Sequence, residues 1–475
     1  MHPTPLRIGF RSSLPCTRAY ASRRGLTSAK SNPSSERVAI SNLEPNHFLP
    51  YSKLQNGLQT IRKRLNRPLT LSEKVLYSHL LDPEHQDLLR GQSTLRLQPD
   101  RVAIHDANAT MAMLQFISAG LPKTALPTSI HCDHLIIAQN GAKADLERAG
   151  HDYAEVYDFL SSASQRYGIG FWKPGAGMIH TVIFERYAFP GALLIGTDSH
   201  TPHAGGMAML GIGVGGSDGV DAMTGLPWEL ACPKIIGIRL EGRLNGWASS
   251  KDIILQIAGR LTVSGGKGKV LEFFGPGAAT LSATEMSTIG NMSAEVGATS
   301  CIFPFSESTE RYLETTDRKD ITLAARKNEN LLVADEDSER YYDDIININL
   351  DEVEPCINGP FTPDLSHRLS NFAVEASNSP WPKQISQAMI GSCTNSSYQD
   401  LSKVADVFRQ ARRAGLKLKV PVFVTAGSET VRSTVERDGV MQDFLDAGAV
   451  VLSNSCGPCV GQWERPDVAK VRLQS

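Results

Sequence analysis

The sequence predicts an α/β protein built from wound sheets. Between about 37 and 233, short apolar runs alternate with amphipathic stretches and Gly-rich turns, as strands and helices do in such sheets. Two apolar runs, 192–195 and 449–452, come shortly before polar clusters that contain Asp198 and Cys456. Because ligands bind at the carboxyl ends of strands in open α/β sheets, we expect a functional site there.

The length, charge and hydrophobicity of the chain indicate which kinds of molecule it can bind. A chain of 475 residues, 41% of them hydrophobic, has room for roughly two to four domains. Its net charge of -2 gives no excess charge to attract nucleic acid or an acidic membrane, and no apolar run is long enough to span a bilayer. The eight scattered cysteines are typical of reduced thiols rather than a disulfide framework. We therefore expect a small-molecule partner.

The first 35 residues differ from the rest of the chain. Arginines and serines are frequent, and no acidic residue occurs before Glu36. This composition predicts a mitochondrial transit peptide, and hence a protein of the mitochondrial matrix; a disordered basic tail is the alternative.

The remaining chain divides into three expected units, 36–233, 234–352 and 353–475. The second unit ends in an acidic segment, 335–344, which we interpret as a solvated connection. No internal repeat is evident after residue 35.

One helix is easy to place in the first unit. Asp152 is the expected N-cap, Glu155 completes a capping box, and Gly168 ends the helix. The residues that mark its buried stripe are Tyr153, Val156, Tyr157, Leu160 and Tyr167.

Histidines are concentrated between residues 105 and 203, where seven of the twelve occur. A lone buried histidine is more often structural than catalytic, but several of these stand beside carboxylates, as in His105-Asp106 and Asp133-His134. An imidazole next to a carboxylate can hold one tautomer and transfer a proton near neutral pH. Hydration and dehydration chemistry needs such groups.

A Gly-rich stretch at 211–216 formally contains the dinucleotide-binding pattern G-x-G-x-x-G. The match is weak, because no clear strand leads into it. A tight turn that approaches a ligand explains the glycines equally well.

Three cysteines form the most informative pattern: Cys393 alone, then Cys456 and Cys459 as a C-x-x-C pair. Three thiolates leave one iron of a four-iron cluster open, and an open iron can act as a Lewis acid. Two alternatives use the same residues. The C-G-P-C tetrapeptide also occurs in thioredoxin-like redox proteins, although only 16 residues follow Cys459, and zinc would need a fourth protein ligand in a structural site.

Four segments, 131–136, 196–202, 391–397 and 456–459, together resemble the aconitase family. The resemblance runs from about residue 37 to 467. It implies a three-domain core of wound α/β sheets around an iron-sulfur site, with the C-terminal swivelling domain of the family absent from this chain.

The resemblance also assigns roles to individual residues. It implies that a 4Fe-4S cluster is held by Cys393, Cys456 and Cys459. The implied paired acids of the catalytic site are Asp133, His134, His180, His200 and Glu295. The residues implied to meet substrate are His105, Asp198, Ser199, His200 and Asn291.

The activity implied is that of a hydro-lyase on a citrate-like tricarboxylic acid, namely citrate, cis-aconitate, isocitrate or a homologue. Three positions depart from the family: His105 replaces a substrate-binding Gln, His203 an Asn, and Gly290 a Cys. These departures predict an altered substrate preference.

The resemblance implies that the family pattern continues beyond 462–465 with substrate arginines and then a C-terminal domain that carries a serine base, whereas this sequence stops at Ser475. The resemblance therefore implies little activity for this chain alone, unless a complementing chain supplies the missing domain. The alternative is a truncated, non-catalytic iron-sulfur or substrate-binding protein, or an incomplete gene model.

Overall fold

The computed structural model describes residues 37–465, so the predicted leader at 1–35 and residues 466–475 lie outside it. The described chain is α/β, as predicted. Three of its sheets are parallel, and two further pairs of strands are antiparallel.

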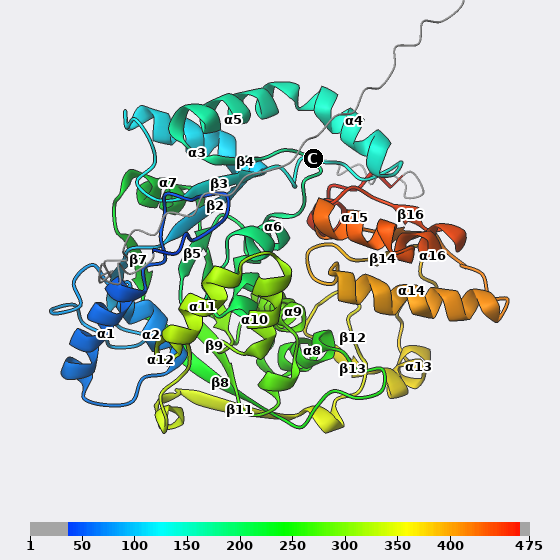
Figure 1. Cartoon of the computed structure of the whole chain (residues 1–475). Coiled ribbons are helices and arrows are strands. Elements are labelled where there is room, and N and C mark those ends of the chain that lie inside the picture. The colour runs from blue at the N-terminus through cyan, green and yellow to red at the C-terminus, as the bar shows by residue number, and fades with distance from the viewer. Residues whose placement is uncertain (1–36, 466–475) are drawn as a thin grey trace, which may run out of the picture. The chain divides into compact units, whose positions relative to one another are not determined.

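The first sheet has five parallel strands, and nearly every strand residue is buried except in the edge strand β4. Burial on both faces explains why these strands read as apolar runs rather than alternating ones. Figure 1 shows α3 and α5 over one face and α6 under the other. In spatial order the strands are β4 (Gly170–Trp172), β3 (Thr128–His131), β2 (Arg101–His105), β5 (Leu193–Gly196) and β6 (Leu210–Gly213). The surrounding helices are α3 (Asp106–Ser118), α4 (Ala142–Asp152), α5 (Ala154–Tyr167), α6 (Ile179–Arg186) and α7 (Gly216–Thr224).

The second sheet has four parallel strands and shares its core with the first. Buried apolar side chains from Ile40 to Val353 form one continuous cluster. In spatial order the strands are β10 (Ser300–Ile302), β9 (Lys269–Phe274), β8 (Lys234–Glu241) and β11 (Asp344–Asn349). The other helices of this block are α1 (Tyr51–Leu65), α2 (Leu71–Ser78), α8 (Ser250–Leu261), α9 (Ala283–Asn291), α10 (Glu307–Thr315), α11 (Lys319–Lys327) and α12 (Glu329–Leu332). The antiparallel pair β1 (Thr94–Leu97) and β7 (Trp228–Ala231) completes it.

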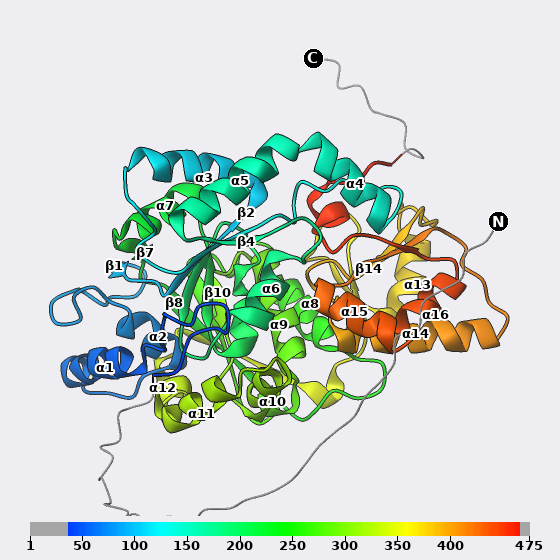
Figure 2. The ribbon, with the colours of Figure 1, turned by 45° about the horizontal axis from the view of Figure 1, so that its top comes forward.

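The third sheet belongs to the last part of the chain, drawn in orange and red in Figures 1 and 2. It has its own core, a cluster of buried side chains between Leu401 and Ala449. Its parallel strands are β14 (Ala388–Ile390), β15 (Val422–Val424) and β16 (Val450–Val451), with helices α13 (Leu369–Asn378), α14 (Tyr398–Arg413), α15 (Glu429–Arg437) and α16 (Val440–Asp446). The hairpin β12 (Cys356–Asn358) and β13 (Ser366–Arg368) precedes them.

Of the two predicted unit boundaries, only the second lies where one hydrophobic core ends. The core is continuous across 233–234, whereas the first cluster ends at Val353, next to the second expected boundary. Both boundaries stay predictions.

The helix predicted from Asp152 ends as expected but begins differently. Gly168 is its C-cap in the left-handed conformation, with φ 73°. The N-cap prediction is wrong: Asp152 is the last residue of α4, Tyr153 precedes α5, and the Tyr153 side chain makes no cap hydrogen bond. Only Tyr153 separates α4 from α5, so the residue that looked like the N-cap of α5 belongs to the C-terminal end of α4. Of the predicted stripe, Tyr157 and Leu160 are buried.

The Gly-rich stretch at 211–216 is not a tight turn, because β6 occupies its first half. A Cβ at Gly211 would lie 2.3 Å from the carbonyl oxygen of Thr201, and one at Gly213 would lie 2.9 Å from that of Asp198. The glycines therefore let the loop after β5 pack directly against β6, which fixes the backbone that carries Asp198.

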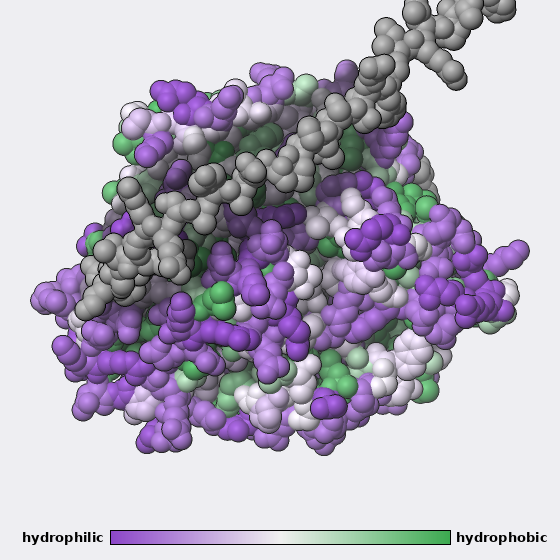
Figure 3. Space-filling view, in the orientation of Figure 1, coloured by the Kyte–Doolittle hydropathy of each residue, from purple (hydrophilic) through white to green (hydrophobic). Residues whose placement is uncertain are grey.

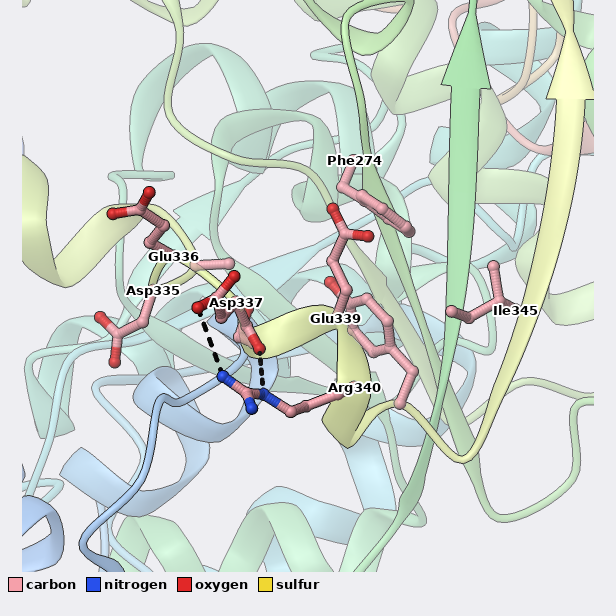
Figure 4. A pocket seen from close by; sticks show the side chains of 10 residues that line it. Phe274, Asp335, Glu336, Asp337, Glu339, Arg340 and Ile345 are labelled. Carbon is pink, nitrogen blue, oxygen red and sulfur yellow. Dashed lines mark hydrogen bonds and ion pairs between the residues drawn. The ribbon is translucent and has the colours of Figure 1, made fainter.

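The acidic segment is only partly the solvated connection that we expected. Glu336 and Asp337 are exposed, but Asp335 forms ion pairs with Arg62 and Lys74 at 2.7 Å. Figure 4 shows the cavity of about 730 Å³ beside this segment, where Arg340 contacts Asp337. None of the residues that line this cavity belongs to the predicted site.

No helix within 37–465 combines the length and apolarity needed to cross a bilayer. The face shown in Figure 3 is mostly hydrophilic, and its hydrophobic residues occur in separate small groups. Scattered apolar side chains of this kind are normal on a protein surface.

Candidate active site

The carboxyl ends of neighbouring strands deliver most of the predicted site residues. His105 is the last residue of β2, Asp133 and His134 follow β3, and Asp198 follows β5. The strand β2 pairs with both β3 and β5, so these ends lie side by side. These residues therefore lie at the strand ends where the sequence led us to expect polar clusters, and their roles stay predictions.

The Asp198 carboxylate, which is 7% exposed, is the centre of the arrangement. His134 Nε2 lies 3.1 Å from Oδ2, and His180 Nε2 and His200 Nδ1 each lie 3.3 Å from Oδ1. Burial alone would raise the pKa of Asp198, but the three histidines outweigh it and hold this pKa well below its usual range. Asp198 is therefore a carboxylate at any physiological pH.

Asp133 and His134 form the second pair. His134 Nδ1 lies 2.9 Å from Asp133 Oδ1, and Asp133 Oδ2 accepts a hydrogen bond of 2.8 Å from the backbone nitrogen of Ile179 at the start of α6. Burial lowers the pKa of His134, but Asp133 and Asp198 together raise it to about 11. His134 is thus a charged imidazolium, a group that can donate a proton.

His200 forms a third pair with Glu295, which lies in the 3-10 helix Met292–Val296. His200 Nε2 lies 3.2 Å from Glu295 Oε1. Burial opposes the charge, but the contacts with Asp198 and Glu295 raise the pKa of His200 to about 11. The neighbouring Ser199 is exposed, and its hydroxyl lies 3.4 Å from His200 Nδ1.

His105 stacks on His134, with ring centroids 4.2 Å apart and an angle of 28° between the rings. Its Nε2 lies 3.2 Å from Asn108 Nδ2, and its Nδ1 is buried without a hydrogen-bond partner among the described residues. Burial and the charge on His134 lower the pKa of His105, so this ring is neutral. Its role in binding substrate stays a prediction.

The cysteines come from loops of the third sheet. Cys393 follows β14 after Gly391. Gly391 has a φ of 108°, and a Cβ there would lie 2.2 Å from the carbonyl oxygen of Thr425, so only glycine fits. Cys456 follows β16, and its backbone nitrogen donates to the Asp133 carbonyl at 3.0 Å. Cys393 and Cys456 are buried beside Met178, whereas Cys459 is exposed. Burial raises the pKa of both buried thiols.

Asn291 connects the two groups of residues. Its Oδ1 accepts hydrogen bonds from Thr394 Oγ1 at 3.1 Å and from Cys393 Sγ at 3.5 Å. Its Nδ2 lies 3.3 Å from His203 Nδ1. The structure therefore brings together residues from all three expected units.

Asp106 is a positioning residue that sequence reasoning did not select. Its carboxylate accepts hydrogen bonds from the backbone nitrogens of His134 and Leu135, at 3.0 and 3.2 Å, and so orients the loop that carries the Asp133-His134 pair. Burial and the charge on Asp133 raise the pKa of Asp106 to about 7. Its place directly after the strand-end residue His105 was the available signal.

Fold and site together define an α/β protein with paired histidines and carboxylates beside three cysteines. The profile of the aconitase family (aconitate hydratase) matches residues 73–475, and the chain belongs to this family.

Individual relatives agree. The chain is 56% identical to a probable mitochondrial aconitate hydratase of Caenorhabditis elegans over 91% of its own length and 56% of that protein. It is 52% identical to the mitochondrial aconitate hydratase of Aspergillus fumigatus, over 96% of this chain and 58% of the relative. It is 53% identical to the mitochondrial aconitate hydratase of Saccharomyces cerevisiae, over 94% of this chain and 57% of the relative. The chain thus spans little more than half the length of these relatives.

Proposed function

We propose that this chain carries the histidine, carboxylate and cysteine part of an aconitase-type hydro-lyase that acts on a citrate-like tricarboxylic acid in the mitochondrial matrix. The observation that carries the proposal is the Asp198 carboxylate, which three histidines contact within 3.3 Å at the ends of parallel strands. The relatives named above are mitochondrial aconitate hydratases, which supports both the reaction and the compartment.

The three cysteines fit an iron-sulfur cluster. Cys393 and Cys456 lie together in one buried group, and Cys459 is one turn beyond Cys456, with its backbone nitrogen 3.1 Å from the Cys456 carbonyl oxygen. Burial disfavours a free thiolate at both buried positions, so a cation that binds thiolates would relieve this cost. A 4Fe-4S cluster on three cysteines would supply a Lewis acid to polarise a substrate hydroxyl.

The chain's own residues account for proton donation to the leaving hydroxyl. Loss of a hydroxyl needs a proton donor, and His134, held charged between Asp133 and Asp198, is suited to that role. His200 is charged as well and lies next to exposed Ser199. A substrate carboxylate that approaches from the exposed side would therefore meet a positive charge. His105, Asn291 and His180 would position the substrate and the paired acids.

The test is anaerobic iron-sulfur reconstitution of the chain, followed by an iron count and a cis-aconitate hydration assay. The proposal predicts iron bound in the wild type and lost in Cys393→Ser. Reconstituted protein that binds neither iron nor tricarboxylate would contradict it. If the chain binds iron but turns over only after a complementing chain is added, the partner prediction is supported.

A second candidate is an iron-sulfur or substrate-binding protein that does not turn over. Exposure of Ser199 and Cys459 favours it, since one side of the site is open to water. Citrate binding without hydration, in the presence of a loaded cluster and of candidate partners, would distinguish it.

A further inference from the structure

The two ends of the third sheet differ in character. Its strands β14, β15 and β16 are parallel, so their carboxyl ends lie together at one end of the sheet and their amino ends at the other. Cys393 and Cys456 follow carboxyl ends. The segments that lead into the amino ends are 381–387, 413–421 and 445–449, which we call the amino-end surface. This surface therefore lies on the side of the sheet opposite to the cysteine loops.

Large apolar side chains are exposed on all three segments of the amino-end surface. Ile385 is 68% exposed, Leu416 65%, Leu445 48% and Leu418 36%. A single exposed leucine needs no explanation, whereas several at one place can mark a contact surface. The end of α14 that leads into 413–421 lies at the edge of the described chain in Figures 1 and 2, where a partner can approach it.

The same surface carries positive charge. No acidic residue occurs between Asp406 and Glu429, and Arg413, Lys417 and Lys419 are exposed within this stretch. None of these three cations forms an ion pair with a residue in 37–465. In the sequence, two of them alternate with the exposed leucines as Leu-Lys-Leu-Lys over 416–419.

The acidic side chains of α16 do not cancel this charge, because other arginines already pair with them. Asp443 lies 2.5 Å from Arg409, and Asp446 lies 2.9 Å from Arg412. Three positive charges therefore remain on the amino-end surface. The net charge of the whole chain, -2, does not reveal a local excess of this kind.

The combination of cations and apolar side chains indicates the kind of partner. Basic side chains are attracted to the head groups of anionic lipids, and apolar side chains beside them enter the boundary between head groups and acyl chains. Nucleic acid would also attract the cations, but its phosphates offer nothing to the leucines. An anionic membrane surface uses both kinds of side chain.

We propose that the amino-end surface binds an anionic phospholipid membrane. Arg413, Lys417 and Lys419 lie next to the lipid phosphates, and Leu416 and Ile385 enter the interface. The cysteine loops, at the opposite end of the sheet, stay away from the lipid. The proposal uses no residue of the candidate active site and does not depend on the hydro-lyase function.

The experiment is co-sedimentation with phosphatidylcholine vesicles that contain or lack the anionic lipid cardiolipin. The chain starts at residue 36 here, because the predicted leader at 1–35 is basic itself and the described fold begins at residue 37. We expect binding to the cardiolipin vesicles alone, and weaker binding at higher salt, which screens exposed charges.

Two sets of substitutions test the two kinds of side chain. Arg413→Gln, Lys417→Gln and Lys419→Gln together should weaken vesicle binding by about 100-fold, which is about fivefold for each charge. Leu416→Gln should weaken it by about tenfold. Circular dichroism checks that the variants fold. If the triple variant does not, the three single variants replace it, each with the fivefold effect.

Matched variants at exposed positions elsewhere are the controls. Lys63→Gln, Lys123→Gln and Lys319→Gln together remove the same charge, and Leu89→Gln changes a leucine that is 60% exposed. Both controls should bind the vesicles as the unchanged chain does.

Three results would overturn the proposal. The first is equal loss of binding in the two triple variants. The second is unchanged vesicle binding in Leu416→Gln together with tighter binding to a DNA duplex, which would make nucleic acid the partner. The third is a folded chain that binds neither kind of vesicle. Iron-sulfur reconstitution decides the proposed function separately from all three.

Discussion

The histidine part and the cysteine part of the site are built differently. Asp133, Asp198 and their histidines lie at the ends of a buried parallel sheet, and most of their polar atoms already have partners at 2.8–3.3 Å. The cysteines lie on loops of a smaller sheet, where two thiols are buried, which raises their pKa, and the third is exposed. The first part is preorganised by the fold, whereas in the second the proposed cluster would favour the thiolate state that burial disfavours.

Asp198→Asn should show this difference most strongly. The substitution removes the negative charge that three histidines share, and breaking a buried ion pair costs about 3–5 kcal/mol. We expect the free energy of unfolding of the metal-free chain to fall by about that amount, and hydration by the loaded, complemented enzyme to fall by about 10²- to 10⁴-fold. Denaturant unfolding measures the first effect. Asp337→Asn, at an exposed carboxylate, is the control, and equal stability of the two variants would contradict preorganisation.

The pH dependence of stability should come from the histidine part. His134 and His200 have a pKa of about 11 in the folded chain against 6.5 as the ordinary value. A raised pKa contributes stability that is complete below about pH 6.5 and is lost as the pH rises towards 11. We therefore expect the Tm of the metal-free chain to fall between pH 6.5 and 10, and to fall less in His134→Gln. His151→Gln should follow the wild type, and a flat profile in the wild type would show that these charges are not held by the fold.

A smaller effect is expected at His105, the position where the chain departs from the family pattern. The ring is neutral and stacked on His134, so it offers one donor and one acceptor where a glutamine would offer two donors and an acceptor. We expect His105→Gln to change the ratio of citrate to homocitrate binding by on the order of tenfold. Calorimetry on the cluster-loaded chain measures it, and an unchanged ratio would end the hypothesis of altered preference.

Sequence reasoning succeeded where the signal was local. The apolar run before Asp198 is β5, the run before Cys456 contains β16, and Gly168 ends α5. It failed where two elements compete for one pattern, as at Asp152, which closes α4 instead of opening α5. The contact of Asp198 with three histidines depends on strand order and on the packing of α6, which no short pattern encodes. The resemblance of four motifs to the aconitase family supplied that long-range information.

The smallest effect should come from the contact between the two parts. Thr394→Val keeps the shape of the side chain but removes the hydroxyl that donates to Asn291 Oδ1 at 3.1 Å. A single hydrogen bond of this kind contributes about 1 kcal/mol, so the free energy of unfolding should fall by that amount. Thr434→Val removes a hydroxyl that bonds only within its own exposed helix and should change stability less. Thr394→Val could leave the stability unchanged while metal loading still stabilises the chain. In that case bound metal, rather than this hydrogen bond, holds the cysteine loops to the histidine part, and the difference between the two parts is larger than we infer.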